Sequence, residues 1–402
     1  MAPHEPQELK NAHNQYFIRW SPQATQADKD KLSKNQIFKS TLWTSELIPN
    51  LELIELNQKI HDSEFQQSTI SQISNVEYSH PNYHQKRTLI PLKGFSDSYY
   101  FNIYNNDDIK DRLYERQWAL NSKWGIQADQ AWSTINTQQL REIKIAVIDT
   151  GIDTEHEDLK DLIIAPYNAF DDSTDVKDTM GHGTHVSGLI AANWNSTGIR
   201  GLHPKVKIIP IKAIPNNSDE SDFNVIKAFE HAAKHGAEVI NCSFGKKISG
   251  QAVSDIMSEL DKKNIMVVMA AGNDSIDVAL YPKFPSAFQN NSHLVVAATS
   301  SVSGALANFS NFNKTLVHIA TPGKSILSTV PGNKYTSYSG TSMAAPIASG
   351  IIGLAKSLYP DLTNQELKKI ILASTLENKT LTNQVLSNGI VDLNIFLKNL
   401  SN

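Results

Sequence analysis

The sequence contains a single cysteine, no long hydrophobic run and little net charge, and each of these shortages excludes a class of protein. With only Cys242 in 402 residues, neither an intramolecular disulfide nor a cysteine-based metal site can form. No apolar run approaches the ~18 residues that a membrane-spanning helix requires. The formal net charge of −4 argues against a nucleic-acid-binding role, which needs a concentrated excess of basic side chains.

What is present is the composition of an ordinary globular protein, 40% hydrophobic and 19% charged. At 402 residues the chain is long enough for roughly two domains. Cys242 directly follows an apolar strand-like run, so we interpret it as a small buried core residue rather than a reactive thiol. The opening stretch MAPHEPQELKNAHNQ has no apolar core of the kind found in export signals. Because such signals are removed on export, secretion stays open.

Residues 1–85 predict a small α+β unit. Its patterns are, in order, the strand QYFIRW, the charged helix QADKDKLSKNQ, two strands around a Pro-Asn turn in STLWTSELIPNLELIELN, the helix-like SEFQQSTISQIS and the closing strand NVEYSHPNYH. This β-α-β-β-α-β order is typical of a ferredoxin-like fold with one sheet and two helices. Residues 86–110 show no clean period, and we expect them to form an exposed linker.

Residues 111–402 show a different sequence pattern, in which apolar strand-like runs alternate with helical patterns. The runs are IKIAVIDT (143–150), KIIPIKAI (207–214), AEVINCSF (237–244), IMVVMAAG (265–272) and LVVAAT (294–299). Nearly continuous apolar strands alternating with helices indicate a parallel sheet covered on both faces. Ligands of such α/β folds bind outside the carboxyl ends of the strands, so polar residues at those ends are candidate site residues.

Asp149 and Asn273 each stand at the end of one of these strands, while His182 and Ser342 stand at the start of helix-like runs. Each residue also has a structural interpretation. Ser342 and Asp149 could cap helices, and His182 with His185 could be a metal pair, although no third ligand lies nearby. Together, however, Asp, His and Ser are what nucleophilic acyl transfer requires. An imidazole takes the proton of the serine hydroxyl, and a carboxylate fixes the tautomer of that imidazole.

Five segments, VIDTGID, GHGTHVSG, NCSFG, AAGN and SGTSMAAP, resemble the sequence blocks of subtilisin-like serine proteases, in the order of that family. The similarity extends from about Asp111 to near Val391. It implies a doubly wound, mostly parallel α/β sheet with helices on both faces, and the activity of a serine endopeptidase. Two departures stand out: Ile347-Ala348 replace the usual His-Val, and Lys246 replaces a usual glycine.

The resemblance implies a catalytic role for each polar residue. Asp149 would orient His182, which would act first as general base and then as general acid. Ser342 would attack the scissile carbonyl. Asn273, together with the backbone N–H of Ser342, would hold the oxyanion, and Thr341 would support this arrangement.

The resemblance also implies where substrate binds. SFG and AAG would form the walls of the main specificity pocket, which makes Ser243, Phe244, Gly245, Ala271 and Gly272 substrate-binding residues. Leu280 would lie near the base of this pocket and favour a large hydrophobic side chain before the cleaved bond. The acidic segment 216–222 would line the substrate further upstream and favour basic residues there, unless it is only a solvated loop.

The segment ANWNSTGIRGLHP resembles the loop that wraps a hard cation in this family, although Asn195 among turn formers could also simply cap a loop. The resemblance implies that Asn195 offers its side chain, joined by the carboxylates of Asp111 and Asp158. The implied carbonyl ligands are Asn193, Thr197 and Ile199. An all-oxygen site of this kind suits Ca²⁺.

The N-terminal unit resembles the inhibitory prodomain of exported subtilisin-like proteases, with NVEYSHPNY as its exit strand. Such a prodomain would act as a folding template for the slowly forming parallel sheet and would cover the active site until it is cleaved in the linker. We therefore predict a self-processing zymogen, secreted or periplasmic and monomeric, that acts on polypeptides. The alternatives are a catalytically silent relative that binds peptides or inhibits partners, and a cytoplasmic processing protease, which the missing signal and absent disulfides would suit.

Overall fold

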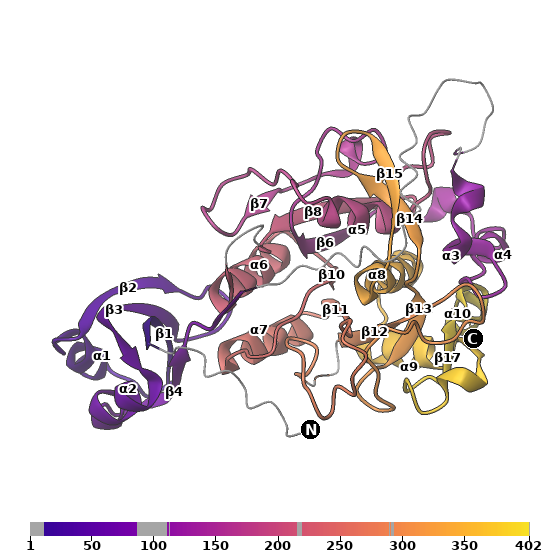
Figure 1. Ribbon diagram of the computed structural model, residues 1–402. Helices are drawn as coiled ribbons and strands as arrows, with labels where there is room; N and C mark the ends of the chain where they lie inside the picture. Colours follow the sequence, from indigo (N-terminus) through magenta and orange to yellow (C-terminus); the bar gives the residue numbers. More distant parts are fainter. Residues whose placement is uncertain are drawn as a thin grey trace.

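The computed structural model describes residues 12–86, 111, 113–214, 219–288, 290 and 293–401. These residues form a four-stranded sheet near the N-terminus and a nine-stranded sheet in the remainder of the chain (Figure 1). Apart from Lys86, the predicted linker 86–110 lies outside the described residues, as do residues 216–218 of the acidic segment. None of the helices in the described ranges is long and apolar enough to cross a membrane.

The four-stranded sheet is antiparallel and has the order β2-β3-β1-β4. Its elements are β1 (Ala12–Trp20), α1 (Gln26–Ser33), β2 (Phe38–Thr44), β3 (Leu51–His61), α2 (Asp62–Ser68) and β4 (Val76–Pro81). The predicted β-α-β-β-α-β order is therefore present. Helix α1 begins where predicted because Thr25 and Asp28 form a capping box, in which each side chain accepts the other's backbone N–H.

The two faces of this small sheet are both buried, but against different partners. Tyr16, Ile18 and Trp20 of β1 point into a core shared with Phe65 of α2. Phe17 lies between them in sequence and therefore points to the opposite face. There it joins an apolar cluster that also contains the helices of the larger sheet. The N-terminal unit is thus packed on the rest of the chain through the face that its own helices leave uncovered.

The nine-stranded sheet has the order β16-β17-β13-β12-β11-β10-β6-β8-β7, and its strand pairs are parallel except β16–β17. Its strands are β6 (Ile143–Asp149), β7 (Tyr167–Asn168), β8 (Val206–Lys212), β10 (Val239–Cys242), β11 (Met266–Ala270), β12 (His293–Thr299), β13 (Ile319–Pro322), β16 (Thr375–Glu377) and β17 (Gly389–Val391). All five predicted apolar runs are strands of this sheet.

Helices cover both faces of this sheet, as Figure 1 shows. They are α5 (His182–Ala191), α6 (Asp222–Lys234), α7 (Gln251–Lys262), α8 (Thr341–Leu358), α9 (Asn364–Leu372) and α10 (Leu393–Leu400). Ile145 of β6 packs in a cluster with α5 and α8, whereas Ala146 packs in the cluster that contains α6 and α7. Alternate residues of one strand thus face different helical layers, which explains its continuous apolar sequence.

Smaller elements complete the chain. They are the short helices α3 (Trp118–Asn121) and α4 (Ala128–Trp132), the antiparallel hairpin β14 (Ile326–Val330) and β15 (Lys334–Tyr338), and the strands β5 (His84–Lys86) and β9 (Asp219–Ser221). Strand β5 follows the N-terminal unit and pairs with β9 in antiparallel orientation, with Gln85 opposite Glu220. The segment that follows the predicted exit strand therefore lies against the large unit.

The parallel register brings the carboxyl ends of the central strands to one edge. Ile148 of β6 pairs with Cys242 of β10, which pairs with Met269 of β11. Asp149 and Asn273 consequently lie at the same edge of the sheet.

Candidate active site

Asp149, the last residue of β6, holds the ring of His182 at the start of α5. Its Oδ1 accepts hydrogen bonds from His182 Nδ1 at 2.7 Å and from the backbone N–H of Thr150 at 2.7 Å. The Asp149 side chain is 1% exposed and that of His182 18% exposed. The turn after β6 requires Gly151, which has φ = 112° and would otherwise put a Cβ 2.2 Å from the Val176 carbonyl oxygen. Because Nδ1 donates to the carboxylate, Nε2 is the nitrogen of His182 that can accept a proton.

Asp178 fixes the first turn of α5 and was not identified from the sequence. This buried carboxylate accepts hydrogen bonds from the backbone N–H groups of Gly181 and Thr184 at 2.8 and 2.9 Å, and from the hydroxyls of Thr150 and Thr184 at 2.9 and 2.7 Å. It thus ties the turn after β6 to the helix that carries His182. No cap signal marks it in the sequence, because the N-cap of α5 is Gly181 and Asp178 lies three residues before that position.

Ser342 is the second residue of α8 and does not cap the helix. The N-cap is Gly340, without a side-chain cap. The hydroxyl of Ser342 donates to the Ser243 carbonyl at 3.0 Å, and the Ser243 hydroxyl donates to the Ser342 carbonyl at 3.0 Å. Asn241, another residue that sequence reasoning missed, donates from Nδ2 to the Ser243 hydroxyl at 2.9 Å. The end of β10 and the start of α8 are therefore locked together around the serine.

Asn273 lies beside Ser342 because Thr341 holds its amide oxygen. Asn273 Oδ1 accepts hydrogen bonds from the backbone N–H and the hydroxyl of Thr341 at 2.8 and 2.9 Å. Among the described residues Asn273 Nδ2 has no hydrogen-bond acceptor, so this donor is available. A Cβ on Gly340 would lie 3.4 Å from Asn273 Nδ2 and 3.6 Å from Ser342 N, which shows that the two donors border the same space.

The residues expected to bind substrate differ in accessibility. Ser243, Phe244 and Ala271 are buried, whereas Gly245 is exposed and Gly272 partly exposed. Leu280 is 72% exposed and follows a turn in which its N–H donates to the Asp277 carbonyl. Leu280 thus lies at the surface, and its place near the base of the specificity pocket, with the preference for a large hydrophobic side chain, stays a prediction.

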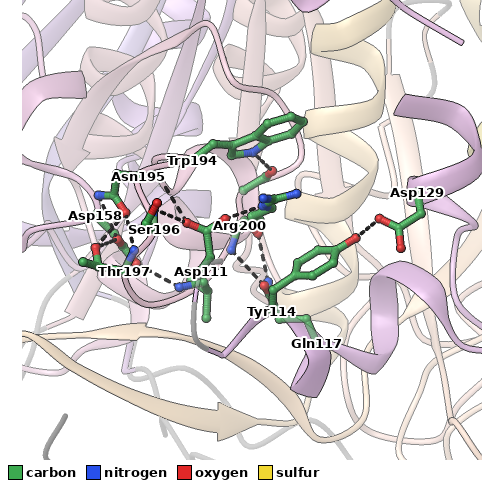
Figure 2. Close-up of polar contacts among 12 residues, drawn as sticks. Asp111, Tyr114, Gln117, Asp129, Asp158, Trp194, Asn195, Ser196, Thr197 and Arg200 are labelled. Atoms are coloured by element: carbon green, nitrogen blue, oxygen red, sulfur yellow. Dashed lines mark hydrogen bonds and ion pairs between the residues drawn. The ribbon is translucent and has the colours of Figure 1, made fainter. Parts of the chain in front are cut away.

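Asp111, Asp158 and the loop 193–200 meet at one place, shown in Figure 2. The backbone N–H groups of Asn195 and Ser196 donate to Asp111 Oδ1 at 3.1 and 2.8 Å. Asn195 Nδ2 donates to Asp158 Oδ1 at 3.3 Å, and Thr197 N donates to Asn195 Oδ1 at 3.0 Å. The backbone N–H of Asn193 donates to the Asp158 carbonyl at 3.0 Å. The structure thus brings together residues that are far apart in sequence and were expected to form one site.

The chemistry of this group fits a hard cation. Asp158 is fully buried, and the donors that bond it in the described part of the chain are all neutral, among them Tyr335 Oη at 2.9 Å and Ile199 N at 3.2 Å. Burial, and to a lesser degree the charge of Asp111, raises the pKa of Asp158 to about 6. Gly198 has φ = 54°, and a Cβ there would lie 2.0 Å from Tyr335 Oη and 2.3 Å from Asp158 Oδ2, so only glycine lets the loop approach this carboxylate so closely. Carboxylate, amide and carbonyl oxygens are the ligands that Ca²⁺ prefers.

Comparison with known proteins agrees with this fold and site. The sequence model of the subtilase family matches residues 141–390, so the chain belongs to this family of serine endopeptidases. It is 34% identical over 248 residues to the major intracellular serine protease of Bacillus subtilis (strain 168), covering 60% of this chain and 76% of that protein. It is 33% identical over 233 residues to thermitase of Thermoactinomyces vulgaris, covering 58% of this chain and 80% of thermitase.

Among solved structures, fervidolysin from Fervidobacterium pennivorans, described as a keratinolytic enzyme related to subtilisin, superposes with a TM-score of 0.78 and 22% sequence identity. The match covers 98% of this chain and 62% of fervidolysin. At this identity the likeness concerns the fold alone. It supports the subtilisin-like architecture of the large sheet.

Proposed function

We propose that the chain hydrolyses peptide bonds through an Asp149–His182–Ser342 triad. The observation that carries this proposal is the 2.7 Å hydrogen bond between Asp149 Oδ1 and His182 Nδ1, formed by a carboxylate that is almost fully buried. Such a bond holds the imidazole in the tautomer whose Nε2 is a base and stabilises the imidazolium that forms when it takes a proton.

In the proposed first step the Ser342 hydroxyl turns from the Ser243 carbonyl to His182 Nε2. It loses its proton to that nitrogen while its oxygen bonds to the scissile carbonyl carbon. The carbonyl oxygen becomes an oxyanion, and Asn273 Nδ2 and Ser342 N donate to it. His182 then gives the proton to the leaving amine, and the C–N bond breaks. Water repeats the sequence on the acyl-enzyme and releases the acid.

Labelling with a fluorophosphonate, which phosphonylates activated serines, tests this proposal together with hydrolysis of a casein substrate. The wild-type chain should be labelled and active, while Ser342→Ala should be neither and His182→Ala should lose both to near the detection limit. The matched control is Ser337→Ala, because Ser337 is exposed in the preceding hairpin. Labelling that persists in Ser342→Ala would refute the assignment of the nucleophile.

We also propose that the N-terminal unit is an inhibitory prodomain and that the chain is a self-processing zymogen. Strand β5 lies against β9, and Lys247 N donates to Gln85 Oε1 at 2.6 Å. Lys247 is only four residues after Ser243, whose carbonyl holds the Ser342 hydroxyl. The chain leaving the small unit therefore takes an extended course against β9 and beside the segment that follows Ser243. An extended substrate pairing by its main chain would need the same kind of strand edge.

The small unit is docked through specific polar contacts as well as through Phe17. Glu230 of α6 accepts hydrogen bonds from the Ser45 hydroxyl and from the N–H groups of Glu46 and Leu47, the latter two at 3.1 Å. These contacts support a role as an intramolecular inhibitor. The predicted boundaries 1–85, 86–110 and 111–402 are part of this proposal.

The intact mass of wild type and Ser342→Ala, followed over time after purification, tests self-processing. Wild type should lose an N-terminal fragment that ends between residues 86 and 110, while Ser342→Ala stays whole. Cleavage of both variants at one site would point to another protease, and an active wild type that is never cut would contradict the zymogen proposal.

We propose further that Asp158, Asp111 and Asn195, with carbonyl oxygens of Asn193, Thr197 and Ile199, bind one Ca²⁺. The ion would supply positive charge to a buried carboxylate and hold the loop to the start of the peptidase unit. Calcium should raise the thermal stability of Ser342→Ala, and Asp158→Asn should abolish that increase. Equal melting temperatures in calcium and in chelator would contradict the site.

We propose a secreted or periplasmic monomer, since an inhibitory unit suits an enzyme kept inactive until it has left the cell. A relative named as an intracellular protease makes the cytoplasm the alternative. Fractionation of the source cells, with detection of the processed form, tests the location. Recovery of the processed form only in the cytoplasm would contradict export.

A further inference from the structure

The two carboxylates of the proposed calcium site are not equivalent. Among the described residues Asp158 has only neutral partners, whereas Asp111 Oδ2 forms an ion pair with Nε of Arg200 (Figure 2). The Asp111 side chain is fully buried, and its Oδ1 is already bonded to two backbone N–H groups of the loop. One of the two negative charges is therefore neutralised by a residue of the chain itself.

Arg200 is held in place from several sides. Its guanidinium lies over the rings of Tyr114 and Trp194, with Cζ 4.8 and 5.1 Å from the two centroids. Its backbone exchanges two hydrogen bonds with the Gln117 side chain, at 2.8 and 2.9 Å. The side chain is 27% exposed. A guanidinium fixed in this way loses little conformational entropy when it pairs with Asp111, and its charge is permanent.

The pair also joins two parts of the chain. Asp111 and Leu113 stand at the start of the peptidase unit, and Leu113 N donates to the Gly198 carbonyl at 2.8 Å. Arg200 ends the loop that Asp111 anchors. The ion pair therefore fastens the same two segments that the proposed calcium ion would fasten.

We infer that Arg200 is a built-in counter-ion of Asp111, which holds this start segment to the loop without a metal and weakens calcium binding there. This inference rests on the calcium site proposed above. A cation entering beside Asp158 meets the positive charge of Arg200 and competes with it for Asp111. The competition at a few ångströms lowers calcium affinity by about tenfold or more.

The test measures the dissociation constant for Ca²⁺, by competition with a fluorescent chelator, in full-length chains that carry Ser342→Ala to prevent self-digestion. Arg200→Gln should bind Ca²⁺ at least about tenfold more tightly than the parent. Arg200→Lys keeps the charge and should stay close to the parent. Arg141→Gln is the matched control, because Arg141 pairs with Glu238 at 2.6 Å elsewhere on the surface.

An unchanged dissociation constant in Arg200→Gln would overturn the inference and leave the calcium proposal standing. If no variant binds Ca²⁺, the calcium proposal fails, and thermal unfolding in chelator decides the counter-ion role. Arg200→Gln must then unfold at a lower temperature than Arg141→Gln. Equal melting temperatures of the two variants would overturn the inference in that case.

Discussion

His182, at the edge of the large sheet where the proposed triad lies, and His80, between the small sheet and α7, are both largely buried but have different partners. His182 Nδ1 faces the carboxylate of Asp149, and its Nε2 has no partner among the described residues. His80 uses both nitrogens on the backbone. Nδ1 bonds to the Pro81 carbonyl at 2.8 Å, and Nε2 accepts the N–H of Ala252 at 3.1 Å.

The difference teaches what a histidine needs in order to act as a base. A buried carboxylate beside Nδ1 stabilises the imidazolium form of His182, and the free Nε2 can accept the proton. His80 lacks both features. Its Nε2 is already an acceptor, so a proton there would face the Ala252 N–H. It is also stacked between Tyr78 and Tyr83, with centroids at 5.6 and 5.7 Å.

The largest effect should follow from Asp149→Asn, which removes the negative charge of the carboxylate that His182 contacts and that has no counterpart at His80 among the described residues. The amide keeps the volume but no longer fixes the tautomer of His182 or stabilises its cation. We expect kcat to fall about 10⁴-fold, the size of this effect in other serine proteases. Steady-state kinetics on a chromogenic peptide measure it, and an unchanged melting temperature is the control. A loss below tenfold would mean that Asp149 is not the partner on which His182 depends.

The next effect should come from the two proposed oxyanion donors. Asn273→Ala removes Nδ2, and Gly340→Ala places a methyl group 3.4 and 3.6 Å from the two donors. For Asn273→Ala we expect kcat to fall about 10²–10³-fold with little change in KM, the range known for this kind of donor in subtilisin. A rise in KM with unchanged kcat would instead indicate a role in ground-state binding.

Sequence patterns predicted much of this fold because a strand that is buried on both faces of its sheet has a nearly continuous apolar sequence, which is easy to recognise. The five apolar runs are strands, and Asp149 and Asn273 could be singled out because each lies at or just beyond the carboxyl end of such a strand. The order of strands and helices in residues 12–81 could be predicted equally well, because apolar residues recur with a different period in strands and in helices.

Supporting contacts were harder to predict because they depend on tertiary placement. Asp178, Asn241 and Arg200 act through partners that are distant in sequence or contact backbone groups, and the composition around them is unremarkable. Leu280 was assigned to a pocket by its position in the chain, whereas its exposure depends on the turn at Asp277. Which face of β1 meets α6 and α7 also could not be read from alternation alone, because both faces carry large apolar residues.

A smaller effect should follow when the docking contacts near His80 are weakened. Asp255 of α7 pairs with Arg19 and accepts the Tyr78 hydroxyl at 2.6 Å. Because these side chains are partly exposed, we expect Asp255→Asn to speed dissociation of the cleaved N-terminal unit only about tenfold. The lag before activity appears after cleavage measures this rate. Glu259→Gln, on the same helix, is the control, and a double-mutant cycle with Arg19→Gln isolates the ion pair.

The smallest effect should be a dependence of docking on pH that originates at His80. Burial lowers the pKa of His80, although the charges of Asp222, Asp62 and Asp255 oppose this shift. A histidine whose pKa is lower in the docked state binds fewer protons there than when free. Its contribution to docking is therefore complete above the free pKa of about 6.5 and is lost as the pH falls below that value.

Between pH 7.5 and 6.0 the affinity of the cleaved unit should fall by at most about fourfold, the limit that a single histidine with a free pKa of about 6.5 can give. His80→Gln should flatten this dependence, because a glutamine carbonyl can accept the Ala252 N–H at any of these pH values. His61→Gln, at an exposed histidine of the same unit, should leave it unchanged. If His80→Gln keeps the full dependence, another group carries it, and the contrast with His182 would then concern hydrogen-bond partners rather than protonation.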